Sequence, residues 1–145
     1  MAEKKLHLRV FTPERITADE KANMVIIRCT TGDMGFLPGH VAYSAVLDCG
    51  VMRVFNEDGE ERLAIFGGLA EIRNDVLTIL ANAAERPEDI DLAAAQAERD
   101  NIKRLLQEPG DDDAETQRHK AALKRSLVRV DVASYALANK QAQEN

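Results

Sequence analysis

The first half of the chain alternates between apolar and polar positions at the spacing of β-strands. Leu6, Leu8 and Val10 alternate with His7 and Arg9, which places one face of this segment toward a core. Further short apolar or β-branched segments predict strands at 24–27, 51–55, 62–66, 70–72 and 76–80.

Turn residues separate these strands. The loop at 56–60 contains Asp58-Gly59, and Arg73-Asn74-Asp75 forms a second tight turn. Many short strands divided by turns predict a β-sandwich or flattened barrel.

From about Ala81 onward the pattern changes, and alanine becomes the commonest residue. Alanine-rich sequence with few prolines and glycines favours helix. Asp89 or Asp91 can cap a first helix that runs to about Gln107, where Glu108-Pro109-Gly110 stops it. Asp112 followed by Glu115 resembles a capping box for a second helix, which we expect to end near Asn139.

An apolar stripe marks the predicted second helix, with members three or four residues apart: Leu123, Leu127, Val130, Ser134 and Leu137. Val128, Val130 and Val132 also alternate, so the pattern alone leaves a strand open. Alanine content and length favour helix. The predicted fold class is therefore α+β, with an N-terminal antiparallel β-sandwich over 1–84, then a hinge and an antiparallel two-helix hairpin over 85–145.

Composition excludes several classes of function. The net charge of −6 argues against a general nucleic-acid binder, which needs a basic surface. The N-terminus, Met1 to Arg9, is mixed and charged, without an apolar stretch of signal-peptide length, and no window approaches the roughly 20 apolar residues of a membrane span. Cys29 and Cys49 match no ligand or disulfide pattern, and we expect both to be free thiols.

The sequence also lacks signs of catalysis. The histidines lie on different predicted elements without a metal-ligand spacing, and no nucleophile, phosphate-binding or dinucleotide motif occurs. We therefore expect no catalytic residues, no metal site and no cofactor.

Charge is distributed unevenly along the predicted hairpin. Residues 108–117 carry five acids and no base, whereas residues 118–140 carry six bases and a single acid, Asp131. The helix dipole accounts for acids at a helix start, but it does not account for bases in the middle of a helix.

The segment Gly32-Asp33-Met34-Gly35-Phe36-Leu37-Pro38-Gly39-His40 resembles the Gly-x-x-Gly-x-x-Pro-x-His signature of the epsilon subunit of F-type ATP synthases. Residues 66–72, which contain a Gly-Gly pair, resemble a second block of that family, and residues 76–81 resemble a third. Residues 5–15 fit the family's opening strand and turn. The match runs in order along essentially the whole chain.

This resemblance implies a non-catalytic rotor subunit of a proton- or sodium-translocating synthase, peripheral at the cytoplasmic face of the cell membrane. It implies that a face containing Gly67 and Gly68 packs on the gamma subunit, and that Asp33, Gly39 and His40 contact the ring of c subunits. From the residues alone, Gly67-Gly68 also fits a bulge or a close backbone approach, and His40 also fits a structural role.

The resemblance further implies that the helical hairpin either folds against the sandwich or extends into the catalytic head beside the gamma subunit, where its partners are the catalytic alpha and beta subunits, and inhibits ATP hydrolysis. We hypothesise that Lys124, Arg125 and Arg129 steer the extended state toward acidic loops of the beta subunits. A free-standing adaptor of the same fold and an unrecognised enzyme are the alternative functions.

Some family members bind ATP as a regulatory ligand through an Ile/Leu-Asp-x-x-Arg-Ala motif. Here Ile90-Asp91 matches, but Ala94 stands at the arginine position. Arg125 and Arg129 lie one helical turn apart, like the family's second-helix pair, and could face a phosphate. ATP binding through Asp91, Arg125 and Arg129 is therefore an expectation that rests on a partial match.

Overall fold

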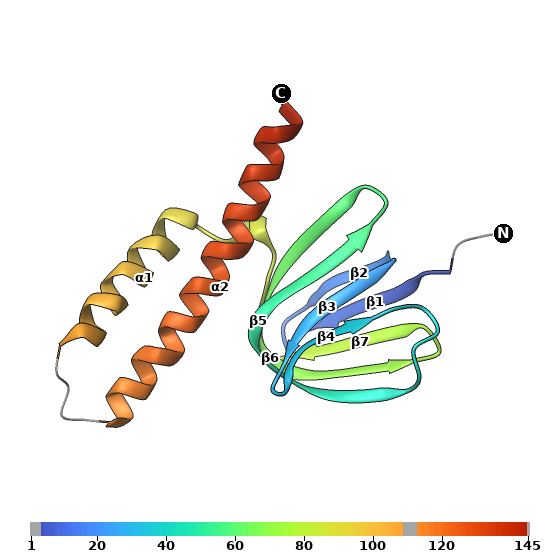
Figure 1. Ribbon diagram of the computed structural model, residues 1–145, viewed down its shortest axis with the longest axis horizontal. Coiled ribbons are helices and arrows are strands. Elements are labelled where there is room, and N and C mark those ends of the chain that lie inside the picture. The colour runs from blue at the N-terminus through green and yellow to red at the C-terminus, as the bar shows by residue number, and fades with distance from the viewer. Residues whose placement is uncertain (1–3, 109–112, 145) are drawn as a thin grey trace. The chain divides into compact units, whose positions relative to one another are not determined.

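The computed structural model describes residues 4–108 and 113–144 (Figure 1). It divides into two compact units, one that ends at Arg86 and one that begins at Pro87. The first unit extends past the boundary predicted at residue 84, because a short strand at Ala84–Glu85 still pairs with the sandwich.

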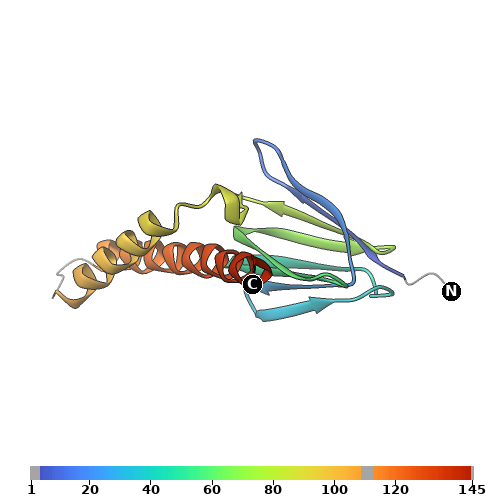
Figure 2. The ribbon, with the colours of Figure 1, turned by 90° about the horizontal axis from the view of Figure 1, so that it is seen from above.

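The first unit is built from β-strands, and their bounds are β1 (Leu6–Phe11), β2 (Ile16–Ala22), β3 (Met24–Cys29), β4 (Gly32–Phe36), β5 (Tyr43–Asn56), β6 (Gly59–Arg73), β7 (Val76–Ala81) and β8 (Ala84–Glu85). They form one curled sheet in the order β2-β1-β7-β6-β5-β3-β4, with β8 added to β6. The β1–β2 and β3–β4 hairpins form its two borders (Figure 2). The predicted β-sandwich is confirmed.

One strand pairing departs from the antiparallel prediction. Among the described strands β1 and β7 pair in parallel, whereas the other pairings are antiparallel. The chain reaches β7 only after a long excursion through β2–β6. A parallel pair needs such a long connection, which local turn signals do not reveal.

The long β5–β6 pair runs through both layers of the sandwich. Strand β7 extends the sheet from the second half of β6, and β3 extends it from the second half of β5. The β5–β6 register skips Asp48 and Gly67, and the φ angles of Gly67 and Gly68 are +78° and +135°. The ladder therefore bends where the sequence places its Gly-Gly pair.

The core follows the apolar alternation seen in the sequence. Leu6, Leu8 and Val10 of β1 are fully buried, as predicted. Large side chains from the other strands complete the core, among them Phe36, Leu63, Ile72 and Ile79.

Strands β2 and β4 were not predicted from the sequence. Both lie at the ends of the sheet order and are rich in charged or glycine residues, with only part of each strand buried. End strands have one neighbour, so their sequences show less of the apolar pattern than central strands do.

The second unit contains a short 3-10 helix η1 (Pro87–Asp89) and the helices α1 (Leu92–Gln107) and α2 (Asp113–Glu144), which pack antiparallel as a helical pair (Figure 1). Asp91 caps α1, one of the two predicted positions. Segment 128–132 is helical, and α2 continues past the predicted end at Asn139. The predicted capping residue Asp112 lies outside the described residues.

The predicted apolar stripe of α2 is partly wrong. Leu127 and Leu137 are 42% and 47% exposed, whereas Ser126, Val128, Val132 and Ala133 are buried. Alanine and valine occur on several sides of this helix, so a spacing of three and four fits more than one face. Among the described residues, no helix combines the length and the apolar character that a membrane span requires.

Candidate functional site

The residues of the family-like signature do not form one cluster. Asp33 lies near the start of β4 and pairs with Arg28 of β3 at 3.2 Å. Gly39 and His40 follow the opposite end of the same strand. A strand rises about 3.3 Å per residue, so Asp33 already lies roughly 10 Å from Phe36, the last residue of β4, and Gly39 and His40 follow beyond it. The structure therefore brings Gly39 and His40 together but not Asp33.

Leu37–His40 form a closed turn, called here the Pro-Gly turn. The His40 N–H donates to the Leu37 carbonyl at 3.2 Å, Pro38 occupies the second position, and Gly39 has a φ of +83°. A turn of this type requires positive φ at its third residue, which glycine adopts without steric cost.

Around this turn, His40 is held by its neighbours. Its ring lies 5.1 Å from that of Phe36 and 6.4 Å from that of Tyr43, measured between centroids. The His40 Nδ1–H donates to the Val41 carbonyl at 2.7 Å. Leu37 and Val41, in contrast, are 55% and 75% exposed, so the end of the sandwich presents apolar side chains on a fixed frame.

A second exposed apolar surface crosses three neighbouring strands. Val46 of β5 pairs with Leu69 of β6, which pairs with Leu80 of β7, and each is more than half exposed. With Ser44, Glu71 and Thr78 they line a shallow groove of about 210 Å³. We call this surface the apolar groove. Contiguous exposed apolar side chains are typical of protein–protein interfaces.

Sequence reasoning missed the apolar groove, although a signal was present. Val46, Leu69 and Leu80 occupy the outward phase of strands whose neighbouring residues Leu47, Ala70 and Ile79 are buried. Apolar residues in both phases of an alternating strand indicate that the outer face is also covered.

The Gly67-Gly68 pair has an explanation within the sandwich. A Cβ atom on Gly68 would lie 2.2 Å from the Leu80 carbonyl oxygen and 2.8 Å from the Ala81 Cα. The approaching backbone is that of β7, so the bulge and the close approach expected from the sequence are both present. Contact of this pair with another subunit stays a prediction.

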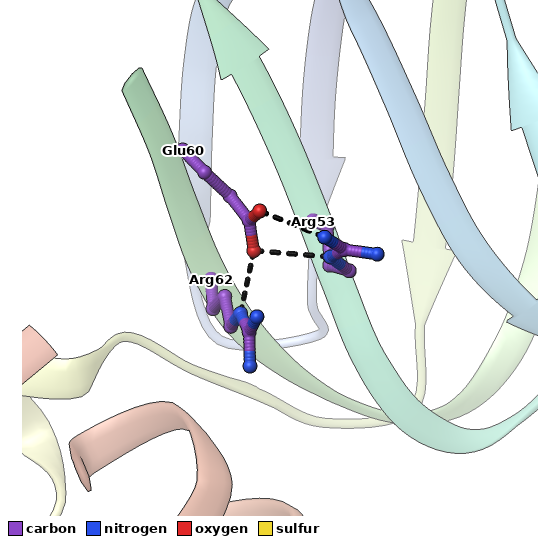
Figure 3. Close-up of polar contacts among 3 residues, drawn as sticks. All are labelled: Arg53, Glu60 and Arg62. Carbon is purple, nitrogen blue, oxygen red and sulfur yellow. Dashed lines mark hydrogen bonds and ion pairs between the residues drawn. The ribbon is translucent and has the colours of Figure 1, made fainter. Parts of the chain in front are cut away.

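The tip of the β5–β6 hairpin carries a cluster of charges, the Glu60 cluster (Figure 3). Arg53 donates to both Glu60 carboxylate oxygens at 3.0 and 2.8 Å, and Arg62 Nε donates at 2.5 Å. These hydrogen bonds, that from Arg53 foremost, hold the pKa of Glu60 below its usual value. Arg53 and Arg62 face each other across the strands, so Glu60 offsets their repulsion.

The connection from the sandwich toward the helical pair is anchored on the sandwich. β8 pairs with Ala64 and Ile65 of β6. Next in the chain, Arg86 donates to the Thr17 carbonyl at 3.2 Å and pairs with Glu61 at 3.6 Å.

Residues predicted to regulate lie on the helical pair. Lys124 and Arg125 are exposed, and Arg129 lies 4.0 Å from Glu98 of α1. The Asp91 carboxylate accepts the N–H of Ala94 at 3.1 Å, which gives it a capping role. Ala94 supplies no charge at the position where the motif has its arginine.

The thiols and metal-ligating groups form no chemical centre in the described part of the chain. Neither Cys29 nor Cys49 forms a disulfide, and burial raises the pKa of the Cys29 thiol, which disfavours its reactive thiolate form. Residues 4–108 and 113–144 contain no group of three or more side chains suited to hold a metal.

Comparison with known proteins matches both units. Residues 5–87 match the family described as ATP synthase, Delta/Epsilon chain, beta-sandwich domain, and residues 88–134 match its long alpha-helix domain. An ATP synthase epsilon chain of Synechococcus sp. WH7803 is 38% identical over 132 residues, covering 88% of this chain and 96% of that protein. The epsilon chain of Desulforudis audaxviator is 40% identical over 106 residues, covering 73% and 77%.

Solved structures share the fold. A chain in the Euglena gracilis mitochondrial ATP synthase OSCP/F1/c-ring structure aligns with a TM-score of 0.73 at 24% identity, over 92% of this chain and 81% of that one. A chain in the central stalk and c-ring of the Tetrahymena thermophila mitochondrial ATP synthase aligns with a TM-score of 0.61 at 14% identity, over 92% and 99%. Both domains of the family and the sequence relatives agree, and the chain belongs to the epsilon subunits of F-type ATP synthases.

Proposed function

We propose that this chain is a non-catalytic rotor subunit in the central stalk of an ion-translocating ATP synthase, peripheral at the cytoplasmic face of the cell membrane. It links the catalytic head to the ring of c subunits. The observation that carries this proposal is a close-packed sandwich with two exposed apolar surfaces, the apolar groove and the end at the Pro-Gly turn. The central-stalk and c-ring assemblies that contain similar folds support it.

We assign the gamma subunit to the face that includes Gly67, Gly68 and the adjoining apolar groove. Strand β7 passes Gly68 and carries Leu80, so the glycine pair and the groove are neighbours. The c-ring contact is assigned to Asp33, Gly39 and His40. Since β4 separates Asp33 from the others, this contact would extend along the strand rather than sit at one point.

A charged substitution tests the gamma assignment. Leu69→Asp should weaken binding of the purified chain to the gamma subunit at least tenfold, because a carboxylate would be desolvated at the centre of the groove. Ile16→Asp is the matched control, since Ile16 is 55% exposed and Leu69 54%. Equal affinities of both variants for the gamma subunit would contradict the assignment. A wild-type chain that binds neither the gamma subunit nor the c subunits would favour the free-standing adaptor.

For the helical pair we propose inhibition of ATP hydrolysis, in an extended state that contacts the alpha and beta subunits. Its support is the basic side of α2, where Lys124, Arg125 and Arg129 lie close together in sequence. Exposed ion pairs contribute only about 0–1 kcal/mol each, so several bases must act together. Replacing all three with Ala should relieve inhibition in the reconstituted complex, while Arg118→Ala with Lys140→Ala should not. Unchanged inhibition by the triple variant would remove the idea.

Regulatory ATP binding is a separate proposal. It requires Arg129 to leave Glu98 and, with Arg125, to bind phosphate oxygens without help from Ala94. Isothermal titration of the full chain with ATP checks it, and Arg125→Ala with Arg129→Ala should abolish the signal. Absence of heat at millimolar ATP would contradict the proposal.

A further inference from the structure

The Pro-Gly turn leaves one strong donor unused within the turn itself. The turn bond joins the His40 N–H to the Leu37 carbonyl, so the Gly39 N–H needs a partner elsewhere. The Asp75 carboxylate provides it and accepts this hydrogen bond at 2.7 Å. Such a bond to an ionised acceptor is stronger than one between neutral groups.

Asp75 belongs to a different tight turn, the one that joins β6 to β7. Asn74 and Asp75 have φ angles of +51° and +63°, the left-handed region that a two-residue hairpin turn of this type requires. The Asp75 carbonyl also accepts the His7 N–H of β1 at 2.8 Å. Its main chain is thus fixed by β1 while its side chain reaches a loop 36 residues away in sequence.

The loop that Asp75 holds carries the most exposed apolar residues of this end of the sandwich. Leu37 and Val41 flank Gly39 and His40, and their side chains are 55% and 75% exposed. Exposed side chains on an unrestrained loop lose conformational entropy on binding, whereas a loop fixed in advance loses less. The hydrogen bond between Asp75 and the Gly39 N–H therefore favours docking, although Asp75 itself does not contact the partner.

We infer that Asp75 is a positioning residue for docking of the sandwich onto the rotor. Its carboxylate holds the Pro-Gly turn in the conformation that presents Leu37, His40 and Val41 to the c-ring. This inference rests on the proposed c-ring contact and adds to it a residue that no part of the family-like signature contains.

Two substitutions of Asp75 separate its acceptor from its turn conformation. Asp75→Gly keeps positive φ accessible but removes the carboxylate, whereas Asp75→Asn keeps a side-chain oxygen and tolerates positive φ. Asn74→Gly is the matched control, since it changes the neighbouring turn residue and leaves the Asp75 side chain in place.

The test measures binding of each full-length chain to a purified gamma–c-ring rotor, together with amide hydrogen exchange at Gly39. We expect Asp75→Gly to weaken binding about five- to tenfold and to speed Gly39 exchange, while its unfolding midpoint stays within the range of Asn74→Gly. Asp75→Asn should restore most of the affinity.

Equal binding by Asp75→Gly and wild type would overturn the inference, as would an equal loss in Asn74→Gly. Fast exchange of Gly39 in the wild-type chain would overturn it without any variant. If the wild-type chain fails to bind the rotor while Gly39 is protected, the proposed c-ring contact is wrong and the docking role of Asp75 falls with it.

Discussion

The sandwich and the helical pair are stabilised in different ways. The sandwich buries large side chains such as Leu6, Phe36 and Ile72 completely, and its strand ends are joined by side-chain bonds. The helical pair buries few side chains, mostly small ones, and many of its alanines are exposed.

This difference in burial predicts a rigid sandwich and a less strongly stabilised helical pair within one chain. A close-packed sheet whose distant loops are joined by hydrogen bonds resists deformation, because its strand register cannot shift without exposing the core. A pair of alanine-rich helices gains little from burial, so under the proposed function a modest difference in binding free energy would be enough to shift it between the folded and the extended state. The proposed function, a rotor subunit that also inhibits ATP hydrolysis, requires both properties.

Among substitutions in the sandwich, Gly68→Ala is expected to cause the largest loss of stability. The new Cβ would clash with the β7 backbone at 2.2 Å, and alanine is strained at a φ of +135°. We expect a loss of about 3 kcal/mol or more in the free energy of unfolding, measured by urea denaturation. Gly35→Ala, whose Cβ would meet only Ile26 at 3.9 Å, is the control and should cost far less. Similar losses in both variants would show that the close approach at Gly68 is not limiting.

A weaker perturbation of the sandwich is Glu60→Gln. The Glu60 side chain is only 12% exposed and holds two arginines that face each other. We expect the free energy of unfolding to fall by about 1–2 kcal/mol near neutral pH. This is less than for a fully buried ion pair, because the Arg53 side chain is 39% exposed and solvent screens the interaction.

The pH dependence of this effect has a defined sign. The pKa of Glu60 is lowered by folding, so its stabilisation is complete above its ordinary value of 4.5 and is lost as the pH falls below it. The loss from Glu60→Gln should therefore shrink in acid. An effect that stays constant between pH 7 and pH 3 would contradict the assigned role.

On the side of the helical pair, Asp91→Ala removes the cap of α1. The Ala94 N–H would lose its acceptor, at a cost of about 1 kcal/mol to that helix. The measurement is the thermal loss of helical circular dichroism. Asp100→Ala, in the middle of α1, is the control and should be neutral or slightly stabilising. If the two variants behave alike, Asp91 does not act as a cap.

The smallest expected effect concerns the exposed pair Lys5–Glu57. The Lys5 ammonium lies 2.9 Å from the Glu57 carboxylate, and this hydrogen bond lowers the pKa of Glu57 to about 2. The contribution of the pair is present above the ordinary value of 4.5 and lost as the pH falls toward 2. Lys5→Met should move the carboxyl titration upward in an NMR experiment. An unchanged midpoint would show that Lys5 is not the cause.

The sequence predicted the features of the fold that local patterns encode. Alternation identified β1 and its buried face, and the Asp91 cap and the turn at Asn74-Asp75 followed from local residue chemistry. Pairing between distant segments was not accessible, so the parallel β1–β7 pair and the polar strand β2 were missed.

The candidate site was predicted less completely. The family-like signature drew attention to His40, but Asp33 lies at the far end of β4 and the apolar groove depends on strand register. The hydrogen bond between Asp75 and Gly39 joins two turns that are 36 residues apart, and no local pattern predicts that they meet. Tertiary contacts of this kind need coordinates.

The central claim is that docking belongs to the sandwich and inhibition to the helical pair. The most direct test adds back either the full chain or a chain ending at Arg86 to synthase particles that lack this subunit. ATP hydrolysis and ATP-driven ion pumping are then measured together. Both chains should restore coupled pumping, and only the full chain should suppress hydrolysis. A truncated chain that suppresses hydrolysis as strongly as the full one, or that cannot restore coupling, would contradict the claim.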